Sequence, residues 1–106
     1  MRRHKKIREE FTWGQNYDKN NERLPKTIRR KLKDISNSHL EGIIKYFQIK
    51  IYNLECNRPT ILGFITRLMN RTIDNKIINS RKMIKLFKTE SRYRIINNIT
   101  VNDYGN

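Results

Sequence analysis

The sequence predicts a small helix-rich α+β domain, with two to three helices, a short N-terminal ribbon and a C-terminal β segment. Two observations support this fold class. Apolar residues recur at helical spacing within 36–54 and 61–88. In the flanking segments, apolar and polar residues alternate or turn-forming Asn and Asp occur. A chain of 106 residues fits one domain, and its 36% of hydrophobic residues allows a modest core. We expect residues 1–10 to be a basic flexible arm and residues 11–106 to be a single compact domain.

The N-terminal ribbon is predicted over residues 11–34. Asp18-Lys19-Asn20-Asn21 has the composition of a turn, and apolar or basic stretches lie on both sides of it. One helical turn fits the second stretch nearly as well, because Ile28 and Leu32 are four residues apart. The preceding MRRHKKIREE has a single aliphatic side chain, which is typical of a disordered arm.

Residues 36–54 give the clearest helical pattern. Ser38 and Glu41 have the spacing of a capping box, in which each side chain satisfies a backbone amide of the other. Apolar and polar residues also alternate over 47–51, so the second half of this segment fits a strand as well. The apolar residues of the stripe are Leu40, Ile43, Ile44, Phe47, Ile51 and Leu54.

Two further helices are expected after a break at residues 57–60. Pro59 suits a first helical position, and the spacing predicts an amphipathic helix over 61–71. Asp74 can cap another helix, on which Arg81, Lys85 and Lys88 line up on the outer face. A helix-turn-helix around Thr72-Ile73 fits the same pattern.

Near the C-terminus, the spacing of apolar residues changes from helical to strand-like. Residues 93–96 and 99–101 have the form of two short strands, joined by the two-residue turn Asn97-Asn98. A single irregular strand is the alternative.

Charge is the main indication of function. The chain has 24 Lys and Arg against 10 Asp and Glu, a formal net charge of +14. An A/T-rich genome would raise Glu together with Lys, so codon bias does not explain the shortage of acids. The excess is concentrated in the first and last thirds, which indicates a negatively charged partner. The candidate nucleic-acid-binding residues are Arg2, Arg3, Lys5, Lys6, Arg8, Arg29, Arg30, Lys31, Lys33, Arg81, Lys82, Lys85 and Lys88.

These clusters predict a non-enzymatic nucleic-acid-binding protein, with RNA preferred over DNA. Aromatic side chains near them, Trp13, Tyr17 and Tyr46, could stack on unpaired bases. The first alternative is a factor that binds an acidic host protein or ribonucleoprotein and inhibits or redirects it. The second is a metal-independent ribonuclease that uses Arg92-Tyr93-Arg94 with Lys85 and Lys88.

The sequence offers little else for catalysis. His4, His39 and Cys56 do not have the spacing of a metal site, and no glycine-rich phosphate loop is present, so we expect no metal, no cofactor and no small-molecule substrate. No apolar run is long enough for a membrane span, and no apolar segment follows the basic N-terminus, so we expect a cytoplasmic protein.

The segment Lys33–Ile44, with Trp13-Gly14 upstream, resembles a group of small uncharacterised tailed-bacteriophage proteins. Their pattern combines a Trp-containing ribbon, a basic strand and a helix start of the form D-[MS]-x-x-H-L. The likeness covers about residues 11–47, and this chain departs from the pattern at Gly42 and in the ribbon turn. The resemblance implies a phage accessory protein without a stated activity, in which His39 and Leu40 are structural positions.

Overall fold

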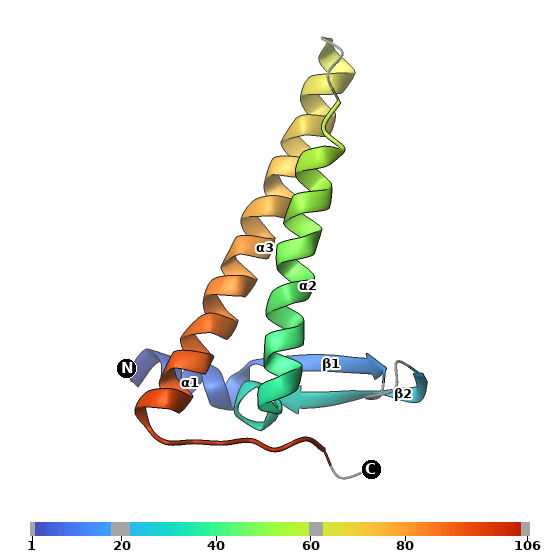
Figure 1. The fold of residues 1–106 in the computed structure, drawn as a ribbon. Coiled ribbons are helices and arrows are strands. Elements are labelled where there is room, and N and C mark those ends of the chain that lie inside the picture. Colours follow the sequence, from blue (N-terminus) through green and yellow to red (C-terminus); the bar gives the residue numbers. More distant parts are fainter. Residues whose placement is uncertain (1, 18–21, 60–62, 105–106) are drawn as a thin grey trace. The chain divides into compact units, whose positions relative to one another are not determined.

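Three α-helices and one two-stranded sheet form the part of the chain that the computed structural model describes, residues 2–17, 22–59 and 63–104 (Figure 1). The helix-rich α+β class is therefore confirmed. The chain divides into two units, one made of residues 1–39 and 90–106 and the other of residues 40–89. Helices α2 and α3 each contribute residues to both units.

The predicted ribbon is present in the first unit. Strands β1 (Thr12–Tyr17) and β2 (Arg23–Lys31) pair antiparallel, with Gly14 opposite Arg29 and an irregularity between Gln15 and Tyr17. The alternative helical turn over 28–32 is wrong, because β2 continues to Lys31 before a 3₁₀ turn, η1 (Leu32–Asp34). The turn expected at residues 18–21 lies outside the described residues.

Residues 1–10 differ from the flexible arm that we expected, because helix α1 (Arg2–Glu10) occupies this segment. Its charges are arranged unfavourably for a helix, with basic residues in the first turns and Glu9 and Glu10 at the end. A nine-residue helix of this kind is marginal on its own. Packing of its inner side chains stabilises it, since His4 is only 6% exposed.

Helix α2 (Asn37–Cys56) confirms the clearest sequence pattern and excludes a strand at 47–51. Its cap differs from the prediction. The Ser36 hydroxyl accepts the backbone N–H of His39 at 3.2 Å, which makes Ser36 the N-cap, whereas Ser38 donates its hydroxyl to Asp103. The Ser38–Glu41 capping box is therefore wrong by two residues.

Helix α3 (Phe64–Ile96) is continuous over 33 residues, so the two expected helices and the helix-turn-helix are wrong. Asp74 lies inside α3 rather than at a cap. The segment 64–96 contains neither Gly nor Pro, and the Thr72 hydroxyl bonds within the helix to the Leu68 carbonyl. Pro59 is not at a first helical position, since α3 begins at Phe64, and residues 60–62 lie outside the described part.

The C-terminal hairpin is also wrong, because residues 93–96 form the last turn of α3. Asn98 has φ 54°, in the left-handed region that Asn tolerates. The Ile99 N–H bonds to the Arg94 carbonyl at 2.8 Å, and the Asn98 N–H to that of Ile95 at 3.4 Å. This pattern is a Schellman cap, which ends the helix, and residues 99–104 continue without regular secondary structure.

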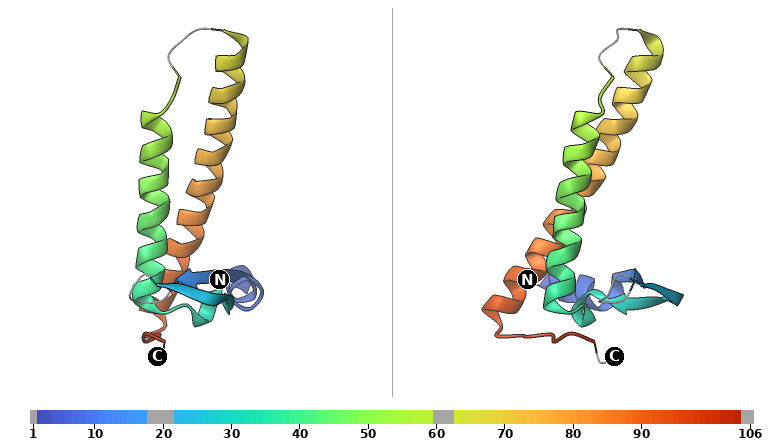
Figure 2. Two further views of the ribbon diagram at one scale, coloured as in Figure 1. Left: turned by 90° about the vertical axis from the view of Figure 1, so that its right-hand side faces the viewer. Right: turned by 45° about the vertical axis from the view of Figure 1, so that its right-hand side comes forward.

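The second unit is an antiparallel helix pair, in which α2 and α3 lie side by side (Figure 2). The rings of Phe47 and Phe87 stack between them with centroids 6.5 Å apart. Leu40, Ile43 and Ile77 are buried in the same unit. In the first unit, Leu32 and Ile35 are inaccessible to solvent and lie between the ribbon and α2 in the sequence.

Candidate nucleic-acid interface

A row of exposed cations follows α3 within the second unit. At 100° per residue, six Lys and Arg side chains fall within an arc of about 120° on one side of the helix. We call this group the α3 cationic stripe; its members are Arg67, Arg71, Arg81, Lys82, Lys85 and Lys88. All six are exposed.

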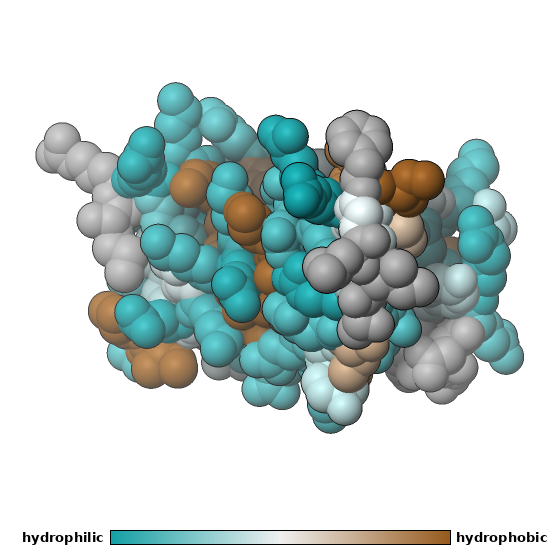
Figure 3. All heavy atoms as spheres, turned by 90° about the horizontal axis from the view of Figure 1, so that it is seen from above, coloured by the Kyte–Doolittle hydropathy of each residue, from teal (hydrophilic) through white to brown (hydrophobic). Residues whose placement is uncertain are grey.

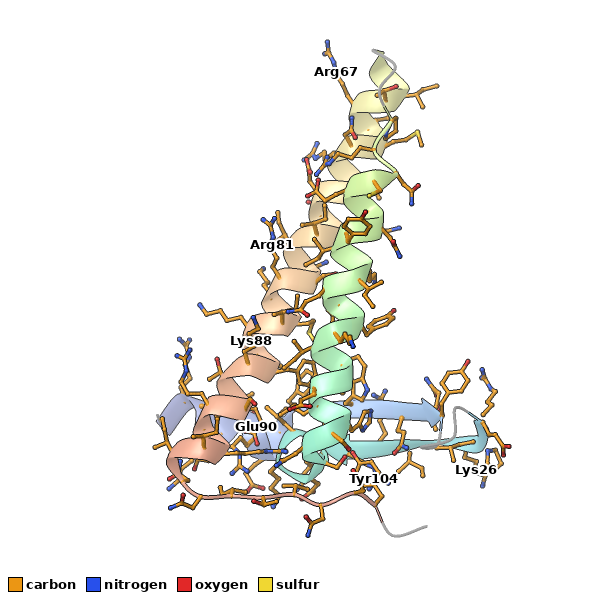
Figure 4. The ribbon with its side chains drawn as sticks, in the orientation of Figure 1. Lys26, Arg67, Arg81, Lys88, Glu90 and Tyr104 are labelled. Atoms are coloured by element: carbon orange, nitrogen blue, oxygen red, sulfur yellow. The ribbon has the colours of Figure 1, made fainter. Side chains whose placement is uncertain are left out.

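The stripe depends on the continuity of α3. At 1.5 Å per residue, Arg67 lies about 32 Å from Lys88 along the axis. Figure 4 shows Arg67, Arg81 and Lys88 extending from the same side of the helix. A break at Thr72-Ile73 would have separated Arg67 and Arg71 from the others, which explains why the sequence pattern identified only the C-terminal half.

The acidic side chain in this part of α3 is Asp74, and an arginine from outside the helix is bound to it. Arg58 donates from Nη2 to Asp74 and from Nε to Glu55, the latter at 3.1 Å. These two carboxylates raise the pKa of Arg58, with the hydrogen bond to Asp74 as the largest cause. Asp74 lies within the arc of the stripe, between Arg71 and Arg81, and Arg58 offsets its negative charge.

The basic residues of α1 divide into two groups. Arg3, Lys5 and Lys6 are exposed, whereas the Arg8 side chain is only 12% exposed and donates to Glu90 at 2.7 Å. Arg8 is therefore a packing residue, unlike the phosphate-binding role that we expected. The side chain of Arg2 is outside the described part.

The cluster of residues 29–33 is divided in the same way. Arg29 is exposed, but the Arg30 guanidinium lies 3.4 Å from the centre of the Tyr104 ring and its Nε donates to Gln15 at 2.9 Å. Lys33 lies 3.2 Å and Lys31 3.9 Å from the Glu9 carboxylate. Arg29 is thus the exposed member of this cluster without an acidic partner among the described contacts.

Glu90 is the centre of a buried charge cluster that the sequence did not indicate. This residue is 0% exposed, and its carboxylate accepts hydrogen bonds from His4 at 2.9 Å, Arg8 at 2.7 Å and Arg94 at 2.7 Å. Arg94 also donates to the Leu32 carbonyl at 3.0 Å. The cluster joins α1, η1 and the end of α3, so its members stabilise the first unit (Figure 4).

The C-terminal segment is fixed against the start of α2. The Tyr104 hydroxyl lies 2.7 Å from Nδ1 of His39 and accepts the Ser36 N–H at 3.0 Å. The Val101 carbonyl accepts the Asn37 N–H at 2.9 Å. Burial, and then the charge of Arg30, lower the pKa of His39. Asp103 and Tyr104 are 65 or more residues from their partners, so no local sequence pattern links them.

Two of the five residues expected for ribonuclease chemistry are buried, and the other three, which include Lys85 and Lys88 of the stripe, are exposed. Tyr93 is 6% and Arg94 3% exposed, and both pack around the Glu90 cluster, while Arg92 is exposed. Within the described residues, no three His, Cys, Asp or Glu side chains are grouped as a metal site would require. None of the described helices combines the length and apolar character needed to cross a bilayer.

Hydrophilic residues cover most of the face that Figure 3 shows, and hydrophobic residues appear there in small groups. Tyr17 and Tyr46 are exposed, whereas Trp13 is half-buried, so two of the three aromatic rings expected to stack on bases are accessible. Comparison of the chain with protein-family models, curated proteins and solved structures found no match.

Proposed function

We propose that this protein binds nucleic acid through the α3 cationic stripe and carries out no chemical reaction on it. The observation that carries the proposal is the set of six exposed cations on one side of a single continuous helix, in two groups about 15 Å apart along the axis. Its length of about 32 Å corresponds to about one turn of a duplex. Phosphates are the dense, regularly spaced anions that match such a row.

Two features favour binding over mere solubility. A surface that serves only solubility intersperses both signs of charge, whereas the stripe contains six cations beside one aspartate, and Arg58 is bound to that aspartate. Lys76, the remaining cation in this part of α3, lies on the opposite side of the helix by its angular position. We place this activity in the cytoplasm, as part of a phage accessory role.

The test is the salt dependence of binding to mixed-sequence RNA and DNA, measured by fluorescence anisotropy. We expect log Kd to rise linearly with log salt, with a slope of up to about 5 if all six cations contact duplex phosphates. Absence of binding to either polymer at low salt would overturn the proposal. Recovery of one stoichiometric acidic protein, free of nucleic acid, from the native cell would favour the alternative protein partner.

A further inference from the structure

The two faces of the β1–β2 ribbon differ in what they contact. Residues directly opposite in an antiparallel pair share a face, so Trp13 and Arg30 lie on one side. Arg30 stacks on Tyr104 and Gln15 bonds to Arg30, which packs this face against the C-terminal segment. The opposite face carries Thr12, Gly14, Asn16, Thr27, Arg29 and Lys31.

We call this second group the Arg29 face. Every side chain on it is polar, and all of its members except Gly14 are exposed. The Glu9 carboxylate lies 3.9 Å from Lys31 at the inner end of the ribbon. The face therefore combines hydrogen-bonding groups with positive charge over most of its length.

Thr27 contacts both the Gly14 backbone and the Asn16 side chain at the centre of this face. A Cβ atom at Gly14 would lie 3.0 Å from the Thr27 methyl group, a tight contact, and 3.6 Å from an Arg29 Nη atom, an ordinary contact, so the Arg29 guanidinium lies beside Gly14 of β1. The Thr27 hydroxyl donates to Asn16 Oδ1 at 2.5 Å and thereby orients the Asn16 amide. Arg29 and Asn16 therefore lie on the same face of the ribbon.

We propose that the Arg29 face enters the major groove of duplex DNA, where Arg29 and Asn16 contact base edges and Lys31 contacts phosphate. This inference rests on the proposed function and adds the type of duplex and the groove. The major groove of B-DNA admits a two-stranded β-ribbon, and Arg and Asn are the side chains that pair with guanine and adenine there. The corresponding groove of A-form RNA is too deep and narrow for side chains to read.

The ribbon is long enough to cross the major groove of B-DNA, which is about 12 Å wide. β2 has nine residues and is about 30 Å long at 3.3 Å per residue. In the part of the chain that the structure describes, no third strand joins the sheet. The ribbon geometry favours duplex DNA over the RNA that the sequence led us to expect.

The test compares Kd at one salt concentration for duplex DNA, duplex RNA of the same mixed sequence, and duplex DNA containing 7-deazaguanine. We expect the unmodified protein to bind duplex DNA at least tenfold more tightly than duplex RNA. Its affinity for 7-deazaguanine DNA, which lacks the N7 acceptor, should be at least threefold lower than for unmodified DNA. Arg29→Gln should weaken binding to duplex DNA about tenfold and binding to duplex RNA less than threefold. The variant should also bind unmodified and 7-deazaguanine DNA with equal affinity.

The matched control is Lys45→Gln, which removes one exposed charge from α2 in the other unit. Asn16→Ala, which changes no charge, should weaken DNA binding by at least threefold and leave RNA binding unchanged. Equal affinity for the two duplexes, or equal effects of Arg29→Gln and Lys45→Gln on DNA, would overturn the groove assignment while leaving binding by α3 intact. If the unmodified protein binds neither duplex DNA nor duplex RNA, both proposals are overturned.

Discussion

The Tyr104 hydroxyl oxygen lies 2.7 Å from Nδ1 of His39, and the two rings meet edge to face with centroids 5.7 Å apart. The same oxygen accepts the Ser36 N–H. The lowered pKa favours neutral His39, whose Nδ1 can accept the hydroxyl hydrogen when the imidazole proton is on Nε2. The groups that face this histidine include the Arg30 guanidinium from β2, while Asp103 bonds to the neighbouring Ser38.

Stability should fall in acid because of His39. Burial and Arg30 lower the pKa of His39 below its value of 6.5 in the unfolded chain, so the unfolded state binds more protons between these two pKa values. The free energy of unfolding should be highest above pH 6.5 and decrease as the pH falls through the lowered pKa. Urea unfolding between pH 8 and pH 5 measures this, and His39→Gln should flatten the curve. An unchanged curve in His39→Gln would contradict the assignment.

Tyr104→Phe should destabilise the protein by about 1–2 kcal/mol, because it removes the hydroxyl and leaves the Ser36 N–H without that acceptor. The ring remains, so the contact with Arg30 is retained. Urea unfolding gives the free energy, and hydrogen exchange of the Ser36 amide should accelerate. Asn102→Ala, at an exposed position in the same segment, is the control and should change the free energy by less than about 0.5 kcal/mol.

Glu90→Ala should destabilise the protein by about 3–5 kcal/mol, because Arg94 would remain buried without its carboxylate. His4 and Arg8 would lose the same acceptor. Chemical unfolding measures the loss, and Glu10→Ala, which removes an exposed carboxylate from α1, should cost less than about 0.5 kcal/mol. Similar values for the two variants would show that the cluster does not hold the first unit together.

Arg81→Gln with Lys85→Gln should lower the salt slope of nucleic-acid binding by about 2, since each contacted phosphate contributes about 0.9 for a duplex. The control is Lys45→Gln with Lys76→Gln, which removes the same net charge from exposed positions outside the stripe. Its slope should equal that of the unmodified protein. If both pairs reduce the slope equally, only net charge matters and the stripe is not the contact surface.

Phe87→Ala should cost about 3–5 kcal/mol, because Phe87 is inaccessible to solvent and stacks on Phe47. Thermal unfolding followed by circular dichroism measures this loss. Ile78→Ala, at an apolar α3 position that is 48% exposed, is the matched control with a small expected effect. A small change in Phe87→Ala would mean that the helix pair of the second unit is not held by this contact.

The sequence by itself determined the features that depend on local periodicity. The 3.6-residue repeat of apolar residues identified α2, and strand–turn–strand composition identified the ribbon, because these signals do not require distant contacts. The same repeat placed Arg81, Lys85 and Lys88 on one side of a helix. Asn97-Asn98 was recognised as a chain reversal, but left-handed Asn suits a helix cap as well as a hairpin turn, and the sequence could not separate the two.

Only the tertiary structure decided which charges are available to a partner. Arg8 and Arg94 resemble surface cations in the sequence, but Glu90 binds both of them in a buried cluster that spans more than 80 residues of chain. Helix α1 forms where composition indicates disorder, because that cluster supplies the stabilisation that the helix lacks alone. Long-range ion pairs and burial leave no periodic trace in sequence, so the division between structural cations and exposed cations required the fold.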